Sequence, residues 1–481
     1  MNHTTLFVQM MRFTLIGLLA VACGAPQAAP TPTMMPSPVP NSEVGTPVVI
    51  DTDLGLDDVM AILYLLQRPD LKVKAITVSG TGLVHCDPGT QHALGLIAIA
   101  GAQDIPVACG RDKPLQGDHT FPRDWREGAD STLGLTWPAG GTVSRQTAVE
   151  LITSIVKSSP QKVMVVTLGP LTNLAEALQN DPKLIDNIKM IAIMGGAVDV
   201  PGNVEGIPLS APNRTAEFNI FVDPQAANIV LKSGAPITLV PLDATNHAPI
   251  PRYFYKALKD NHLTPAATAV FDLFKANPHL YQSGTYFWWD PVAAVAATDD
   301  GVATFETKKL SVVEAEGAEV GRTKAANDGA EVRVAMTVDA ERLEQVFLST
   351  LNGGQAVTID RTVVTPEPNA TVTFAEDKCT YKAAQQLPLG QVGIDWIVED
   401  KNHDKFGLAV LTLDQGKSIK DLAAWTSTDQ PPWSQLVAFH EAAPGSRSIV
   451  TAEVEEGPIY FVCFTAYPEM ILGALGPIEV K

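Results

Sequence analysis

Short apolar runs alternate with longer amphipathic stretches from Gly45 to Gly353. β-Branched runs are typical of buried strands, whereas apolar residues spaced three and four apart are typical of helices. The pattern predicts strands at 48–50, 73–78, 162–167, 188–193 and 236–240. It predicts helices at 58–66, 146–158, 174–179, 224–233 and 271–277. This alternation indicates an α/β domain at 47–353, with a mostly parallel sheet and helices on both faces.

The pattern changes after Gly353-Gly354, where short strands follow one another between Gly and Pro turns. We expect strands at 369–374, 393–398, 406–413, 448–454, 460–464 and 477–480. Regular short strands of this kind predict an all-β sandwich at 354–481.

Four carboxylates, Asp51, Asp53, Asp57 and Asp58, lie within eight residues directly behind the first predicted strand. They fall where a strand ends and a helix begins, which is where open α/β sheets bind ligands. Like charges this close repel one another unless a cation or a polyol satisfies them. Capping of the following helix by Asp57 and Asp58 is the alternative, although it accounts for fewer of the acids. The segment therefore predicts a metal or ribose site.

This segment resembles the opening Asp-x-Asp-x-Gly-x-Asp-Asp signature of the inosine-uridine-preferring nucleoside hydrolases. Further segments similar to that family follow in the same order, at 165–175, 191–196, 216–227, 242–245, 289–294 and 313–323. Each is weak alone, but an ordered set over one large domain is specific. The haloacid-dehalogenase phosphatases are the nearest rival for the first motif, and Leu54-Gly55-Leu56 fits them poorly.

The resemblance implies a metal-dependent hydrolysis of the N-glycosidic bond of ribonucleosides, with Ca²⁺ as cofactor. It implies that Asp53 is the general base and a metal ligand. The other implied metal ligands are Asp58, Asp290, the backbone carbonyl of Leu168, and Asp51 in support. The implied substrate-binding residues are Asp57, Thr81, Met194, Asn203 (or Asn213), Glu217, Phe218, Asn219 and Trp289. A cap of the following helix is the alternative role for Glu217 and Asn219.

Two departures from the family pattern concern the substrate. Thr81 stands where many relatives have Asn, and Trp289 stands where some pyrimidine-preferring members have His. Trp289 could stack on a purine ring, with Trp288 either beside it or in the core. Candidate proton donors to the leaving base are His85, His92 and His119, each of which could equally be a surface or capping residue.

The N-terminal segment resembles a secretory signal, with one basic residue and a short apolar run at 10–22 before Cys23. Leu19-Ala-Val-Ala-Cys23 resembles a lipobox, so we expect residues 1–23 to be a lipoprotein signal and Cys23 to carry lipid. The Pro- and Thr-rich stretch at 24–46 is typical of a tether. The expected location is therefore extracytoplasmic and membrane-anchored, with free secretion as the alternative.

The chain is acidic, with a net charge of −19, and no basic face for nucleic acid is visible. Of 5 cysteines, four remain after Cys23, and Cys379 with Cys463 is the natural pair in the last domain, although sequence alone leaves the pairing open. The last strands are similar to the closing hairpin of cupredoxins. Phe406 stands where a first copper-binding His would be expected, and His403 and Met470 leave the ligand set incomplete, so we expect no copper.

Two hypotheses follow. The first is an extracytoplasmic ribonucleoside hydrolase, for which the family resemblance implies a homo-oligomer, a dimer or a tetramer. The second is a non-catalytic nucleoside- or ribose-binding surface lipoprotein, which the changes at Thr81 and Trp289 and the added sandwich favour. The complete set of metal-side acids favours the first.

Overall fold

The computed structural model describes residues 45–131, 135–204, 212–362, 367–376, 378–383, 386–402, 406–424, 431, 433–466 and 469–481. The expected signal, Cys23 and the tether therefore lie outside the described residues, as does His403. Among the described residues, we find no helix with the length and apolar character needed to cross a membrane.

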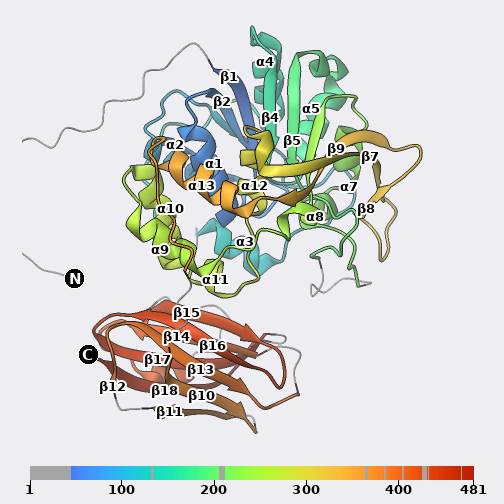
Figure 1. Cartoon of the computed structure of the whole chain (residues 1–481). Coiled ribbons are helices and arrows are strands. Elements are labelled where there is room, and N and C mark those ends of the chain that lie inside the picture. Colours follow the sequence, from blue (N-terminus) through green and yellow to red (C-terminus); the bar gives the residue numbers. More distant parts are fainter. Residues whose placement is uncertain are drawn as a thin grey trace, which may run out of the picture. The chain divides into compact units, whose positions relative to one another are not determined.

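A nine-stranded mixed sheet forms the frame of the α/β part (Figure 1), in the order β3-β2-β1-β4-β5-β6-β9-β7-β8. Its strands are β1 (Thr46–Thr52), β2 (Leu71–Val78), β3 (Val107–Cys109), β4 (Val163–Thr167), β5 (Ile188–Met194), β6 (Ile237–Val240), β7 (Ala303–Val312), β8 (Thr323–Ala325) and β9 (Ala330–Val338). The strands from β3 to β9 pair in parallel, whereas β7 is antiparallel to both β9 and β8. The predicted parallel sheet is confirmed, with an antiparallel edge that the sequence pattern did not predict.

Helices cover both faces of this sheet because successive residues of a strand point to opposite sides. On β1, Val48 and Ile50 belong to one apolar cluster and Val49 to the other. The first cluster contains residues of α1 (Leu56–Gln67), α2 (Cys86–Ile99), α8 (Leu242–Thr245), α9 (Arg252–Asp260), α10 (Pro265–Ala276), α11 (His279–Gln282), α12 (Trp289–Ala296) and α13 (Ala340–Leu351). The second contains residues of α4 (Ala148–Ser158), α5 (Thr172–Asn180), η2 (Pro182–Asn187), α6 (Phe218–Val222) and α7 (Pro224–Leu231).

Helix starts differ from the predicted ones where a capping side chain sets the boundary. The helix predicted from residue 271 begins at Pro265, because the Thr264 hydroxyl accepts a hydrogen bond from the Ala267 amide at 3.1 Å. The helix predicted from residue 146 begins at Ala148, because Thr147 caps it through Glu150. Apolar periodicity locates a helix, whereas the cap decides its first residue.

The C-terminal part is the expected all-β sandwich, built from two sheets. A four-stranded sheet has the order β11 (Lys378–Ala383), β10 (Pro368–Ala375), β13 (Gly390–Val398), β16 (Arg447–Val454). A five-stranded sheet has the order β12 (Gln386–Leu387), β18 (Glu469–Val480), β17 (Gly457–Ala466), β14 (Phe406–Leu413), β15 (Ser434–Ala442). Both sheets contribute to one apolar core, which includes Phe374, Trp396 and Phe461. The sequence pattern missed β11, β12 and β15, and it also missed the short helix α14 (Ile419–Ala423).

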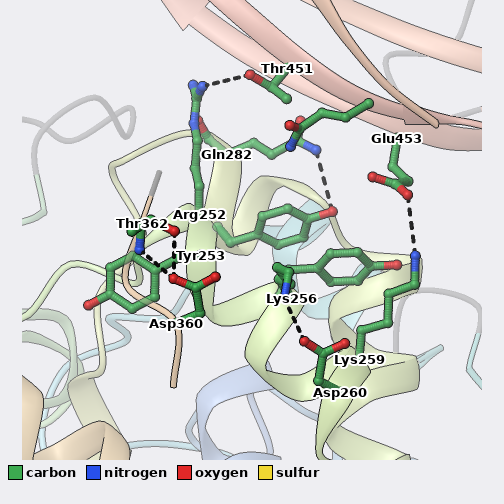
Figure 2. Close-up of a pocket in the computed structure, with 13 residues that line it drawn as sticks. Arg252, Tyr253, Lys256, Lys259, Asp260, Gln282, Asp360, Thr362, Thr451 and Glu453 are labelled. Atoms are coloured by element: carbon green, nitrogen blue, oxygen red, sulfur yellow. Dashed lines mark hydrogen bonds and ion pairs between the residues drawn. The ribbon is translucent and has the colours of Figure 1, made fainter. Parts of the chain in front are cut away.

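Polar contacts connect a strand of the sandwich with helix α9 (Figure 2). Arg252 Nη1 donates to the Thr451 hydroxyl at 3.4 Å, and Lys259 Nζ lies 3.2 Å from a Glu453 carboxylate oxygen. The Lys259–Glu453 pair is half-exposed, and solvent screening leaves such pairs little net energy.

Two disulfides join the four described cysteines. Cys379 pairs with Cys463, as the sequence suggested, with a Cα–Cα distance of 6.2 Å. Cys86 pairs with Cys109 at a Cα–Cα distance of 5.6 Å, which links the start of α2 to the end of β3. Disulfides of this kind persist in oxidising compartments.

Candidate active site

The carboxylates that follow β1 gather at the carboxyl end of the parallel strands. Asp53, Asp58 and Asp290 are at most 4% exposed, and Asp57 is half-buried. Asp290 reaches the same place from the first turn of α12, and carboxylate oxygens of Asp57, Asp58 and Asp290 lie within 4.8 Å of one another. The fold therefore brings together acids that are far apart in the sequence.

Asp58 is held by the turn that precedes it. Its Oδ1 accepts from the Thr52 hydroxyl and, at 3.2 Å, from the Asp53 amide. Its Oδ2 accepts from the Gly55 amide at 2.9 Å, which is the contact of a helix cap. The capping role considered for this residue is thus real, and the same carboxylate also faces Asp57 and Asp290.

Two glycines fix the position of Asp53. Its Oδ2 accepts from the Leu83 amide at 2.9 Å. A Cβ placed on Gly82 would lie 2.5 Å from that Oδ2, and a Cβ on Gly169 would lie 2.9 Å from the Asp53 Cγ. The backbones at both positions approach the carboxylate as closely as they do because neither residue has a side chain.

Asp51 lies behind this group, in the sheet. Its Oδ1 accepts from the Thr77 hydroxyl at 2.6 Å and from Asn173 Nδ2 at 2.8 Å. Burial raises the pKa of Asp51 to about 7, partly offset by those two donors. Neither Asp51 nor Asp53 is among the described carboxylates whose oxygens lie within 4.8 Å of one another, which are those of Asp57, Asp58 and Asp290.

Burial raises the pKa values of Asp53 and Asp290 well above the ordinary range, and repulsion from Asp58 raises both further. Burial and the charge of Asp58 raise the pKa of Asp57 to about 7. Asp290 Oδ1 is buried and accepts no hydrogen bond from any residue that the structure describes. Clustered carboxylate oxygens, one of them without a donor, suit a hard divalent cation, which would supply the missing positive charge.

Aromatic residues border the acids on the side of Asp57. The Tyr286 hydroxyl donates to Asp57 Oδ1 at 3.1 Å, and burial raises the pKa of Tyr286 well above 10.0, so its proton is retained. The Trp289 ring packs edge-on against Tyr286, with centroids 4.8 Å apart. Trp288 is fully buried and packs against Phe254, so the core interpretation is the right one for Trp288.

A second set of polar groups lies at the ends of β4 and β5. Asn219 Nδ2 donates to the Leu168 carbonyl at 3.0 Å and to the Met194 carbonyl at 3.3 Å. Both carboxylate oxygens of Glu217 accept backbone amides, from Asn219, Ile220 and Gly196. Glu217 therefore does cap a helix, α6, while Asp223 caps the separate helix α7 through Ala226.

The other residues with expected substrate contacts make structural hydrogen bonds. Asn203 Oδ1 accepts from the Phe218 amide at 3.0 Å. Asn213 Nδ2 donates to the Val320 carbonyl at 2.7 Å, and its Oδ1 accepts from the Ala216 amide. Thr81 is buried and shares hydrogen bonds with the hydroxyls of Ser79 and Thr172.

Residues 48–345 match the sequence profile described as "Inosine-uridine preferring nucleoside hydrolase". This chain belongs to that nucleoside hydrolase family. Uridine nucleosidase 1 of Arabidopsis thaliana is 34% identical over 288 residues, which is 57% of this chain and 80% of the relative. The pyrimidine-specific ribonucleoside hydrolase RihA of Shewanella oneidensis is 40% identical over 208 residues, 42% of this chain and 61% of the relative.

Solved nucleoside hydrolases share the fold. The plant nucleoside hydrolase PpNRh1 aligns with a TM-score of 0.56 and 31% identity, covering 64% of this chain and 99% of its own. The purine-preferring ribonucleoside hydrolase of Gardnerella vaginalis aligns with a TM-score of 0.54 and 27% identity, covering 64% and 98%. These similarities support a nucleoside hydrolase whose substrates are small ribonucleosides.

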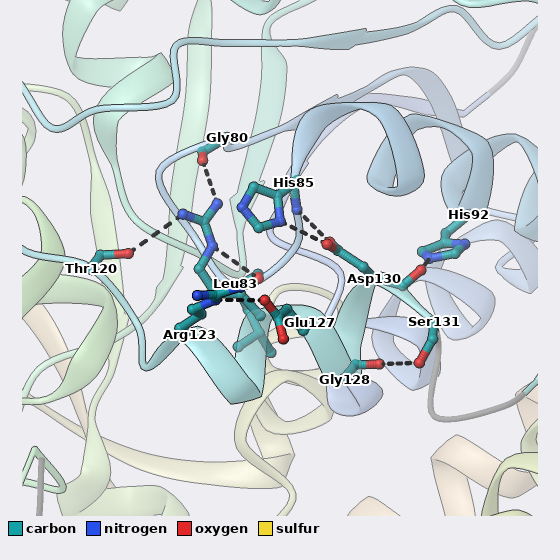
Figure 3. A network of polar contacts seen from close by, with 11 residues as sticks. Gly80, Leu83, His85, His92, Thr120, Arg123, Glu127, Gly128, Asp130 and Ser131 are labelled. Atoms are coloured by element: carbon teal, nitrogen blue, oxygen red, sulfur yellow. Dashed lines mark hydrogen bonds and ion pairs between the residues drawn. The ribbon is translucent and has the colours of Figure 1, made fainter. Parts of the chain in front are cut away.

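The three histidines considered as proton donors in this nucleoside hydrolase all have partners. His85 Nδ1 lies 2.7 Å from an Asp130 carboxylate oxygen, and His92 Nε2 donates to the Asp130 carbonyl (Figure 3). His119 Nδ1 donates to the Phe221 carbonyl at 2.9 Å. Figure 3 shows His85 and His92 beside helix α3 (Arg123–Asp130), where their hydrogen bonds join α3 to the loop before α2 and to α2 itself.

Sequence reasoning did not identify Tyr286, Asn173 or Gly82 as parts of the site. Tyr286 could have been noticed, because it opens the aromatic run that ends at Asp290. Asn173 lies within the family-like segment at 165–175, yet its hydrogen bond to Asp51 depends on the pairing of β1 with β4. Gly82 carries no sequence signal for its closeness to Asp53.

Proposed function

We propose that this nucleoside hydrolase is metal-dependent, and that it uses Asp53 to activate water for attack on the ribose C1′ of a ribonucleoside. The observation that carries the proposal is the convergence of Asp57, Asp58 and Asp290, with one buried Asp290 oxygen lacking a hydrogen-bond donor among the described residues. Ca²⁺ is the proposed cation because it accepts several carboxylates in flexible geometry.

The residues proposed to hold the cation are Asp53, Asp58, Asp290 and the Leu168 carbonyl, with Asp51 in support. A bound Ca²⁺ would lower the pKa of a water molecule and hold ribose hydroxyls. Asp53, with its raised pKa and a position fixed by Gly82 and Gly169, would take the proton of the attacking water.

Asp57 is proposed to accept hydrogen bonds from the ribose hydroxyls, with Tyr286 holding its carboxylate in place. The proposed contacts to the rest of the sugar and to the base are Thr81, Met194, Asn203, Glu217, Phe218, Asn219 and Trp289. Glu217 and Asn219 already bond to backbone groups, so they would meet hydroxyls with their remaining donors and acceptors. A substrate that lacks a hydroxyl would leave a buried polar group unpaired, which predicts discrimination against deoxyribose.

We also propose that Cys23 carries lipid and anchors the enzyme outside the cytoplasm, with 24–46 as a tether. The sandwich is proposed to be cupredoxin-like and free of copper. Two facts support this: Cys463 is bonded to Cys379, and Phe406 is buried in the sandwich core. A disulfide sulfur cannot serve as the thiolate that a blue-copper site requires.

The test is ribose release by the full-length protein from uridine and inosine, in Ca²⁺ and in chelator. We expect release that needs the metal, and its loss in Asp53→Asn with the fold retained. Asp272→Asn is the matched control, because Asp272 is exposed on α10 and its side chain makes no hydrogen bond or ion pair to any described residue. Metal-independent release, or a normal rate in Asp53→Asn, would contradict the mechanism. Nucleoside binding without release would identify the non-catalytic binding lipoprotein instead.

A further inference from the structure

His279 begins the short helix α11 and faces the aromatic residues that border Asp57. Its ring meets the Tyr286 ring edge to face, with centroids 5.8 Å apart. Tyr286 also packs against Trp289, and its hydroxyl donates to Asp57. His279 is therefore one ring away from the carboxylate proposed to hold the ribose hydroxyls.

The imidazole of His279 has unused hydrogen-bonding capacity. Neither ring nitrogen makes a hydrogen bond to any residue within the described ranges. By contrast, His85, His92, His119 and His262 each bond to a backbone or carboxylate oxygen. Burial lowers the pKa of His279 to about 4, so the ring is neutral at pH 7 and offers one N–H donor and one nitrogen acceptor.

The two sides of the proposed sugar site differ in chemistry. Around Asn219 and Glu217 the groups are amides, carbonyls and a carboxylate, which suit hydroxyls. Around Tyr286 and Trp289 the groups are aromatic rings, which suit the flat face of a nucleobase. A neutral imidazole at the edge of an aromatic wall can hydrogen-bond to the carbonyl oxygens and ring nitrogens of a base that lies on that wall.

We propose that His279 binds the leaving base of the substrate and donates a hydrogen bond to it as the N-glycosidic bond breaks. This inference rests on the proposed function. The electron pair of the C1′–N bond moves to the base nitrogen, the hydroxyl of water bonds to C1′, and the remaining water proton ends on that nitrogen. His279 keeps its own proton throughout. Its hydrogen bond strengthens as negative charge builds on the base, so it favours the transition state over the bound substrate.

The test compares substrates whose leaving groups differ in their need for a hydrogen bond. We would measure kcat/KM of the full-length His279→Ala enzyme with uridine, inosine and p-nitrophenyl β-D-ribofuranoside. Losing a donor to a buried polar group predicts a decrease of about 10- to 100-fold with the nucleosides. The nitrophenolate leaves without such help, so its rate should stay within about threefold of wild type. His279→Gln, which keeps a donor and an acceptor, should recover part of the loss.

His247→Ala is the matched control, since His247 is exposed and should leave all three rates unchanged. An equal loss with all substrates would identify His279 as a packing residue and overturn the proposal, as would no loss with any of them. If wild type hydrolyses none of the three, the proposed function itself fails. In that case, we would compare the thermal stabilisation of the protein by uridine with that by ribose. If the extra stabilisation by uridine is lost in His279→Ala, His279 binds the base; if the extra stabilisation persists, the proposal is overturned.

Discussion

Replacing Gly82 with Ala probes the position of Asp53 while leaving the Asp53 side chain itself unsubstituted. The added Cβ would lie 2.5 Å from Asp53 Oδ2, about 0.9 Å inside the 3.4 Å at which ordinary contacts begin. The Gly169 backbone limits the movement of Asp53 away from Gly82. That backbone lies so close to Asp53 that a Cβ on Gly169 would be 2.9 Å from the Asp53 Cγ. The carboxylate, the loop at Gly82, or both must therefore move by most of an ångström.

A shift of about 1 Å in a reacting group can cost about 100-fold in rate, and we expect a decrease of that order in kcat/KM for uridine. Overpacking should lower the free energy of unfolding by about 1–3 kcal/mol, visible in a thermal melt as a shift of a few degrees. Gly141→Ala is the control, because its Cβ would lie 3.7 Å from Leu94 Cδ2, an ordinary contact. If Gly82→Ala kept kcat/KM within threefold of wild type while Gly141→Ala behaved normally, the assignment of Asp53 as the base would be refuted.

Two further predictions concern charge and packing. Burial holds the pKa of Asp51 at about 7, above its ordinary 3.8, so the native state binds more protons than the unfolded state between these values. Metal-free protein should therefore lose stability as pH rises from about 4 to about 7, and Asp51→Asn should flatten that trend in thermal melts; an unchanged slope would contradict the pKa. Trp288→Ala should cost about 3–5 kcal/mol because Trp288 is fully buried, whereas Trp289→Ala should mainly raise KM for nucleosides. The opposite pattern in chemical denaturation and kinetics would show that the two roles are exchanged.

The sequence predicted both folded parts because their patterns are local. A buried strand such as β1 needs only consecutive apolar residues, and its alternation sends Val48 and Val49 into different cores. The sandwich was visible for the same reason, although short strands such as β12 were missed. Two residues carry too little periodicity to identify a strand, and β12 exists only because β18 pairs with it.

The acids after β1 were found because they lie close together in the sequence, and family resemblance added Asp290. Sequence alone therefore determined the acidic cluster and the class of reaction. Tertiary structure decided which oxygens meet, since Asp290 joins Asp57 and Asp58 only when α12 packs beside α1. It also decided that Trp288 is core, that Glu217 caps α6, and that the ring nitrogens of His279 make no hydrogen bond to any described residue. The physical reason is that burial and hydrogen bonding depend on neighbours brought close by the fold, and those neighbours lie far away along the chain.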